Sequence, residues 1–133
     1  MATQYALTDF CESKMLSHVF NDPDRTYYLA LYTVAPSETT PGEEVPTEAT
    51  GYSRQEIVFS TPYVPDGSTA TVVSNTNTAS FGPALSNWGI IEGGAIFDDM
   101  GEMLVYGVLT HPQAITEGNK IEFGPGAVEI GLD

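Results

Sequence analysis

Two apolar runs joined by a short polar segment limit what this chain can fold into. They extend from Trp88 to Phe97 and from Met103 to Leu109, and Asp-Asp-Met-Gly-Glu at residues 98–102 joins them. Both runs are too short and too rich in glycine for a stable helix, whereas isoleucine, valine and aromatic side chains suit a strand. The pattern predicts a β-hairpin, which we expect to be the central and most buried pair of an antiparallel sheet. The glycines within the first run indicate a bulge or the close approach of another backbone segment.

A second pattern, over residues 7–20, predicts an α-helix. Thr8 is a suitable N-cap, and Asp9 favours the positive end of the helix dipole. Pro23 ends the helix, because proline cannot continue the hydrogen-bond ladder. The apolar face is expected to comprise Cys11, Met15, Leu16, Val19 and Phe20. This face either packs against the sheet or docks onto a neighbouring subunit, and the sequence leaves both alternatives open.

Residues 27–33 form the strongest single strand pattern. Leu29 and Leu31 lie on one face of the predicted strand, and Tyr28 and Tyr32 lie on the other. Because both faces carry apolar or aromatic side chains, we expect the strand to be covered on both sides.

Residues 34–50 break this regularity with prolines, a glycine and several acidic or hydroxyl side chains. The composition predicts a long loop. Loops of this length in compact domains are usually functional or mobile. The segment is therefore either a binding or interface loop or a flexible connection.

Further short strands complete the pattern, at 55–60, 69–74, 76–81, 120–123 and 127–132. The second and third are rich in Thr, Ser, Val and Asn, as exposed or edge strands are. The last two are expected to pair with each other as a closing hairpin. About seven or eight short strands at roughly ten-residue spacing are typical of a β-sandwich or jelly roll. We predict one mainly β domain over residues 1–133, with an N-terminal α-helix and an antiparallel β-sandwich over residues 27–133.

Charge is the one extreme property of the composition. The chain has 18 acidic residues against 4 lysines and arginines, a formal net charge of -14. Nucleic-acid binding is not expected, because phosphate backbones are bound by clustered basic side chains. The acidic residues either maintain solubility, or meet a basic partner or divalent cations where subunits join. No membrane-spanning run or export signal is evident, and we expect a soluble protein.

The residues that usually carry chemistry are few. His18 lies in the predicted helix, His111 precedes Pro112 in an expected loop, and Cys11 is expected to be a buried, inert thiol. No nucleophile, phosphate-loop, dinucleotide or zinc motif is present. We therefore predict neither an enzyme nor a cofactor.

Clustered carboxylates raise one further question. Asp98, Asp99 and Glu102 could coordinate a cation, and a metal-assisted hydrolase is the remote alternative that would use them. We favour turn chemistry instead, with an aspartate accepting backbone N–H groups in the hairpin loop.

Arg54 stands out because arginine is rare in so acidic a chain. It follows Gly51-Tyr52 directly, and we expect it to have a carboxylate partner. The partner lies within the subunit or in a neighbouring one. Either way, the prediction is structural rather than catalytic.

Several short motifs together resemble a known family. They are Leu29-Ala30-Leu31-Tyr32-Thr33, Glu44-Val45, Gly51-Tyr52-Ser53-Arg54-Gln55, Asn87-Trp88-Gly89 and Ile96-Phe97-Asp98. In order and spacing the chain is similar, over nearly its whole length, to small structural proteins of tailed bacteriophages. Members are labelled tail fibre protein, minor tail protein or head decoration (cement) protein.

The resemblance implies a non-enzymatic virion protein, assembled in the host bacterial cytoplasm in several copies. We expect a capsid decoration protein that contacts the major capsid protein, and trimers would suit the three-fold positions of a capsid. The alternative is a tail, baseplate or tail-fibre protein for assembly or host attachment. In that case exposed Tyr52, Tyr63 and Trp88 would be candidates for binding host glycans. The candidate structural or interface residues are Leu29, Leu31, Glu44, Tyr52, Arg54, Trp88 and Asp98.

Overall fold

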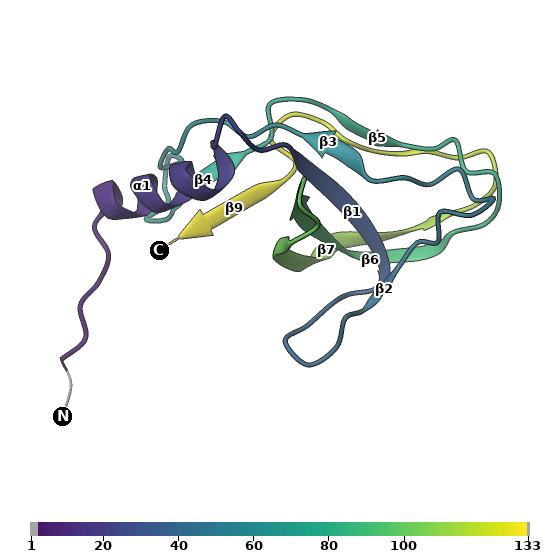
Figure 1. The fold of residues 1–133 in the computed structure, drawn as a ribbon, viewed down its shortest axis with the longest axis horizontal. Coiled ribbons are helices and arrows are strands. Elements are labelled where there is room, and N and C mark those ends of the chain that lie inside the picture. Colours follow the sequence, from purple (N-terminus) through teal and green to yellow (C-terminus); the bar gives the residue numbers. More distant parts are fainter. Residues whose placement is uncertain (1–2, 133) are drawn as a thin grey trace.

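The computed structural model describes residues 3–132, which form an α-helix followed by nine β-strands (Figure 1). In chain order the elements are α1 (Asp9–Phe20), β1 (Tyr27–Val34), β2 (Glu43–Glu44), β3 (Gln55–Ile57), β4 (Thr71–Ser74), β5 (Ala79–Phe81), β6 (Gly89–Asp98), β7 (Met103–Ile115), β8 (Ile121–Phe123) and β9 (Glu129–Leu132). The mainly β fold with one N-terminal helix is as the sequence predicts. No helix in the described range is long and apolar enough to cross a membrane.

The larger sheet is antiparallel and has the strand order β2-β1-β6-β7, with β3 also paired to β1. The predicted hairpin is confirmed as β6 and β7. Its position is not as predicted, because β1 and β6 are the central, buried pair, with Leu29 opposite Ile96. β7 lies at the edge of the sheet and most of its side chains are exposed. A strand with a neighbour on only one side leaves the backbone N–H and C=O groups of its other side without a strand partner.

The second layer consists of two short ladders, β4 with β9 and β5 with β8. The predicted closing hairpin of 120–123 with 127–132 is therefore wrong. These segments pair instead with the two strands that follow residue 70. Thr71–Ser74 and Ala79–Phe81, expected to be exposed or edge strands, are largely buried, and α1 packs against the first of them. Composition did not indicate this, since threonine and serine also pack well on a covered face.

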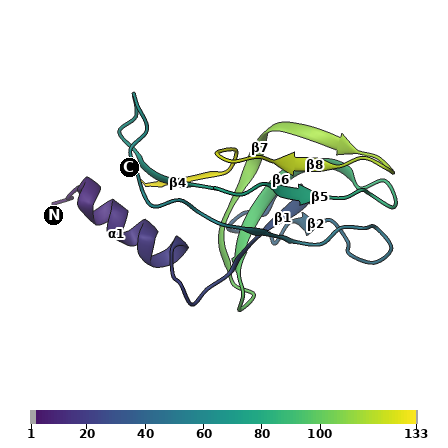
Figure 2. The same ribbon diagram turned by 90° about the horizontal axis from the view of Figure 1, so that it is seen from above.

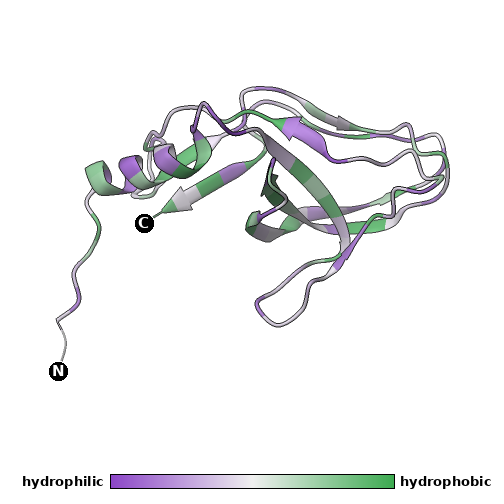
Figure 3. Ribbon diagram, in the orientation of Figure 1, coloured by the Kyte–Doolittle hydropathy of each residue, from purple (hydrophilic) through white to green (hydrophobic). Residues whose placement is uncertain are grey.

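The main hydrophobic core lies between the two layers and includes Leu29, Leu31, Val73, Phe81 and Ile96. A second buried cluster, Ala30, Tyr32, Ala95 and Phe97, lies on the opposite face of β1 and β6. Strand β1 is therefore covered on both sides, as predicted. Figure 3 shows the contrast between β1, which carries hydrophobic residues, and the mainly hydrophilic β3 beside it.

Helix α1 lies at one end of the molecule, beside β4 and β9 (Figures 1 and 2). The Thr8 hydroxyl oxygen accepts the Cys11 N–H at 3.1 Å, so the predicted cap is confirmed. The predicted apolar face is partly wrong, because the buried residues are Glu12, Leu16 and Phe20. Met15 and Val19 remain 46% and 40% exposed. Packing of Phe20 against Phe59, with ring centroids 5.3 Å apart, is one contact that sets the rotation of the helix.

Candidate functional site

The residues singled out around Arg54 form a connected cluster on the large sheet. Glu44 lies on β2 opposite Tyr32 of β1, and Arg54 directly precedes β3, whose first residue Gln55 is opposite Leu29. Since β2 and β3 both pair with β1, they bring together side chains that are ten positions apart. The sheet pairing thus positions the cluster.

Arg54 and Glu44 form an ion pair with two hydrogen bonds. Arg54 Nε donates to Glu44 Oε2 at 3.0 Å, and Arg54 Nη2 donates to Glu44 Oε1 at 2.9 Å. The Tyr52 hydroxyl donates to Glu44 Oε2 at 2.6 Å and accepts the buried Leu31 N–H at 3.0 Å. The Arg54 guanidinium lies 3.7 Å from the centroid of the Phe97 ring. The expected carboxylate partner of Arg54 is therefore confirmed, and it belongs to the same chain.

The pKa values of these groups reflect the same contacts. Burial alone would raise the pKa of the Glu44 carboxyl, but hydrogen bonds from Arg54 and Tyr52 outweigh it, and the pKa is lowered. Burial and the hydrogen bond to Glu44 raise the pKa of Tyr52 far above its usual range. The hydrogen bond to Glu44 raises the pKa of Arg54. Glu44 therefore stays ionised, Tyr52 stays neutral, and the cluster is suited to holding strands together.

The predicted long loop, residues 34–50, is interrupted by β2, which carries Glu44 of this cluster. Val45 is 1% exposed and its N–H donates to the Leu31 carbonyl at 3.1 Å. Residues 37–41 are exposed and form the projecting tip, where the Ser37 N–H donates to the Thr40 carbonyl at 2.9 Å. The tip and residues 46–49 therefore keep the surface exposure that an interface loop needs.

Two of the three aromatic residues considered for glycan binding are buried. Tyr52 is 3% exposed and Trp88 is 5% exposed, whereas Tyr63 is 41% exposed. The Trp88 indole N–H donates to the Thr50 carbonyl at 2.8 Å, and the Tyr52 ring packs on Phe81 and Trp88. The expectation that Tyr52 and Trp88 are exposed candidates for glycan binding is wrong, because both side chains are buried.

The carboxylates of the β6–β7 turn have structural partners. Asp98 Oδ1 accepts the N–H groups of Met100 and Glu102 at 2.9 and 3.0 Å, as turn chemistry predicts. Asp99 lies 3.6 Å from Arg25 in an exposed ion pair. Within residues 3–132 no group of three or more His, Cys, Asp or Glu side chains could hold a metal ion.

Two of the other residues weighed for chemistry, Cys11 and His18, lie on α1, and the third, His111, lies on β7. His18 is exposed on α1 as expected, and Cys11 is half-buried rather than buried. His111 is exposed and lies within β7, not in a loop as predicted. Leu29 and Leu31 are core residues, 5% and 0% exposed.

Sequence reasoning missed Asn75, a buried side chain that joins the short ladders of the second layer. Its amide donates to the carbonyls of Asn77, Phe123 and Gly124, and its Oδ1 accepts the Val128 N–H at 2.9 Å. These bonds hold the segment between β8 and β9 against Asn75. The two strands do not form a hairpin, because β8 pairs with β5 and β9 pairs with β4. An asparagine between two Thr/Ser-rich segments gives no distinctive signal of such a role.

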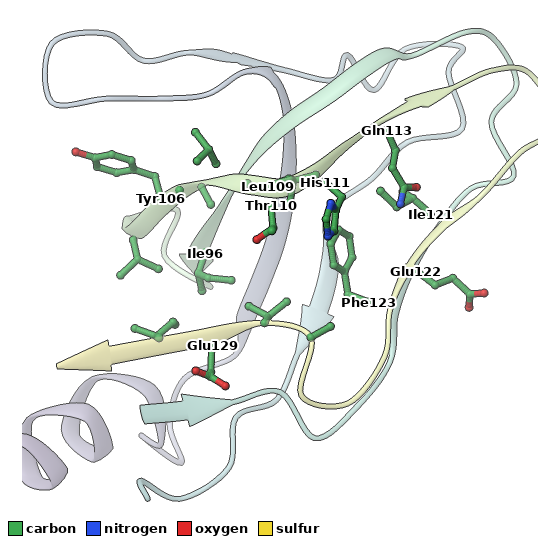
Figure 4. A pocket seen from close by; sticks show the side chains of 18 of the residues that line it. Ile96, Tyr106, Leu109, Thr110, His111, Gln113, Ile121, Glu122, Phe123 and Glu129 are labelled. Atoms are coloured by element: carbon green, nitrogen blue, oxygen red, sulfur yellow. The ribbon is translucent and has the colours of Figure 1, made fainter. Parts of the chain in front are cut away.

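A groove of about 710 Å³ lies between β7 and the β8–β9 segment (Figure 4). Its walls include Val105 and Leu109 from β7 and Phe123, Val128 and Ile130 from the opposite side. Sequence reasoning missed the groove. Pro112 was the available signal, because proline inside a strand is confined to sheet edges and bulges.

The chain matches a known protein family. The family model described as Podophage GP4 fiber I protein gp80 matches residues 6–131. No curated protein matches the chain. The match favours the alternative expectation, a tail-fibre protein, over capsid decoration. Because it covers the helix and all of the sheets except the last residue of β9, the chain belongs to this family of phage fibre structural proteins and is a virion component.

Proposed function

We propose that the chain is a non-enzymatic building block of a phage fibre, present in several copies, that works by presenting a rigid β-sandwich to other virion proteins. The observation that carries the proposal is the family match over residues 6–131, which spans nearly the whole sandwich. A trimer was expected for a capsid three-fold position, and the fibre family removes that argument.

The hydrogen bonds made by the polar side chains support a structural role. Glu44, Arg54 and Tyr52 hold β2 and the segment before β3 to β1. Asp98 closes the β6–β7 turn, and Asn75 joins the two ladders of the second layer. Each of these groups makes hydrogen bonds within the chain, and such networks give a rigid, unique fold.

Labelling intact particles tests the location. Antibody fragments raised against the purified chain would be bound to particles and located by electron microscopy. We expect label on fibres, and label spread over the capsid shell would overturn the proposal in favour of decoration. Particles treated with fragments against an unrelated protein are the control.

The loop tip is the place to test for a contact with another virion protein. Deleting residues 37–49 would also remove Glu44 and Val45, so we propose replacing only residues 38–40 with a diglycine link. Residues 66–68 form an equally exposed turn and supply a matched control replacement. We expect the change at residues 38–40, but not the control, to reduce incorporation into particles. Unchanged incorporation would remove the tip from the interface.

A further inference from the structure

The hydrophobic core is incompletely covered on one side of the sandwich. The apolar side chains that pack against the core while only partly buried all come from β7, β8, β9 and the residue before β9 in the described part of the chain: Leu104, Val105, Leu109, Phe123, Val128, Ile130 and Leu132. These segments flank the groove of Figure 4. The two layers are therefore not closed against each other at this edge, and the apolar interior reaches the surface there.

Strand β7 is the free edge of the large sheet beside this groove. Within residues 3–132 it pairs only with β6. Natural proteins protect such edges with proline, charged side chains or bulges. Pro112 and two shifts in the pairing with β6 protect the ends of β7, whereas Val105–Val108 between the shifts pairs regularly and has no proline or charge. The opposite wall has no edge of equal length, because a turn at residues 124–127 separates β8 from β9.

The side chains of this segment of β7 alternate between two surroundings. Val105 is opposite Ile96 of the main core and lines the groove. Tyr106 is opposite Ala95, which belongs to the buried cluster on the other face of the sheet. On that face the Tyr106 hydroxyl donates to Glu38 Oε1 at 3.0 Å. A strand added beside β7 would alternate in the same way, with one row of side chains in the apolar groove and the other row beside Tyr106 and Glu38.

Charge indicates what the outward row of side chains should be. Among the described residues, those that line the groove include Glu122 and Glu129 but no lysine or arginine, and Figure 4 shows both carboxylates directed away from β7. Glu38 adds a third carboxylate on the outer side of β7. The interior of the groove is therefore apolar, while its surroundings are acidic. An occupant with cationic side chains in the outward row is attracted, and one with carboxylates there is repelled.

We propose that the groove binds an extended segment of a different protein, in which apolar residues alternate with lysine or arginine, as a strand added to β7. In strand addition the backbone hydrogen bonds provide affinity, and the surroundings of alternate side chains provide specificity. This chain has no such segment, because none of its basic residues has an apolar neighbour on both sides: Lys14, Arg25, Arg54 and Lys120. The inference rests on the proposed function, since it gives the chemistry of a virion protein that the fibre chain contacts.

Binding of designed peptides to the purified full chain tests this chemistry. The probe is a fluorescent peptide of about seven residues, a usual strand length, in which valine alternates with lysine. We expect it to bind about tenfold more tightly than the same peptide with glutamate in place of lysine. A third peptide has the composition of the first, but its valines and lysines form two separate blocks, so it measures attraction by net charge alone. Equal affinity for the alternating and block peptides would overturn the proposal.

Filling the groove tests the location. Gly107 lines the groove, and a Cβ atom there would meet no atom within 4 Å, so Gly107→Trp should fold as wild type does, which an unfolding curve checks. We expect this variant to bind the alternating peptide about fivefold more weakly, because the indole occupies the space of the inward valines. Gly124→Trp is the matched control, since Gly124 has equal room for a Cβ atom but does not line the groove. Unchanged binding in Gly107→Trp would show that the peptide lies elsewhere.

Hydrogen exchange gives a second measurement. Amide exchange in Val105–Val108 should slow when the alternating peptide binds, because an added strand covers the free edge. Slowing confined to α1, whose exposed face carries Met15 and Val19, would overturn the proposal. So would a wild type in which this segment is already protected by a second copy before any peptide is added.

The inference and the proposed function fail in different experiments. A chain that binds none of the peptides, yet is labelled on the fibres of intact particles, overturns the strand addition alone. Label spread over the capsid shell overturns the proposed function, whatever the peptides show.

Discussion

The Arg54 guanidinium lies 3.7 Å from the centroid of the Phe97 ring while it binds the Glu44 carboxylate through two nitrogens. Arginine can do both at once because its guanidinium is planar and its donors point outward in that plane. The contact links the segment before β3, strand β2 and strand β6 on one face of the large sheet. A side chain at the surface thereby covers the second buried cluster.

Replacing Arg54 tests the strength of this link. We expect Arg54→Leu to lower the free energy of unfolding by about 1 to 3 kcal/mol, the usual range for hydrogen bonds to charged groups. Arg54→Lys should recover only part of the loss, because an ammonium group cannot make the two-point contact. Urea unfolding followed by Trp88 fluorescence measures both. Arg25→Leu is the matched control, because Arg25 is equally exposed but lies 3.6 Å from Asp99, and we expect a change below about 0.5 kcal/mol. Equal losses in the free energy of unfolding for Arg25→Leu and Arg54→Leu would show that the two-point contact of Arg54 with Glu44 adds no stability.

The lowered pKa of Glu44 predicts a pH dependence. Because the folded-state pKa lies below the unfolded one, the stability that Glu44 contributes is present above its ordinary pKa of 4.5 and is lost as pH falls through the folded-state pKa. Between about pH 6 and about pH 3, the free energy of unfolding should fall more steeply in wild type than in Glu44→Gln. The other carboxyl groups are common to both proteins, so the difference isolates Glu44. Arg54→Leu should flatten the same part of the curve, and parallel curves for all three proteins would contradict the prediction.

The Tyr52 hydroxyl can be tested apart from its ring. Tyr52→Phe keeps the packing on Phe81 and Trp88 but leaves the buried Leu31 N–H without its partner. We expect a loss of about 1 to 3 kcal/mol in the free energy of unfolding, the cost of an unsatisfied buried group. Tyr106→Phe is the control, because Tyr106 also donates to a glutamate, Glu38 at 3.0 Å, but on the exposed surface. A loss in Tyr106→Phe as large as in Tyr52→Phe would show that burial does not matter.

Features set by neighbouring residues were predictable from the sequence. The Asp98 turn, the Thr8 cap and the two covered faces of β1 follow from short-range patterns and were predicted. It was predictable that Arg54 forms an ion pair, because a rare cationic side chain in an acidic chain usually lies near a carboxylate. Its partner, Glu44, was not identified, since β2 is only two residues long and gives no periodic signal.

Features set by distant contacts were not predictable. Alternation predicts that residues 120–123 and 127–132 are strands but does not name their partners, and the nearest partner in sequence proved wrong. The helix has two adjacent apolar stripes, and contacts with distant residues, among them Phe59 and Thr71, decide which is buried. Glu12, buried against Thr71 at 2.7 Å, shows that charge alone did not identify the exposed face.

Asn75 provides the sharpest test of the pairing that sequence reasoning missed. Its side chain donates to three carbonyls and accepts one N–H, while only 2% of the residue is exposed. We expect Asn75→Ala to lower the free energy of unfolding by about 2 to 4 kcal/mol, because several buried groups lose their partners together. Asn119→Ala is the control, since Asn119 Nδ2 donates to Thr116 Oγ1 at 2.7 Å on the surface. We expect a change below about 0.5 kcal/mol there. Amide exchange should also quicken at Val128 in Asn75→Ala, because that N–H donates directly to the missing Oδ1. A variant with wild-type stability and unchanged exchange at Val128 would show that the backbone ladders alone hold β8 and β9 in place.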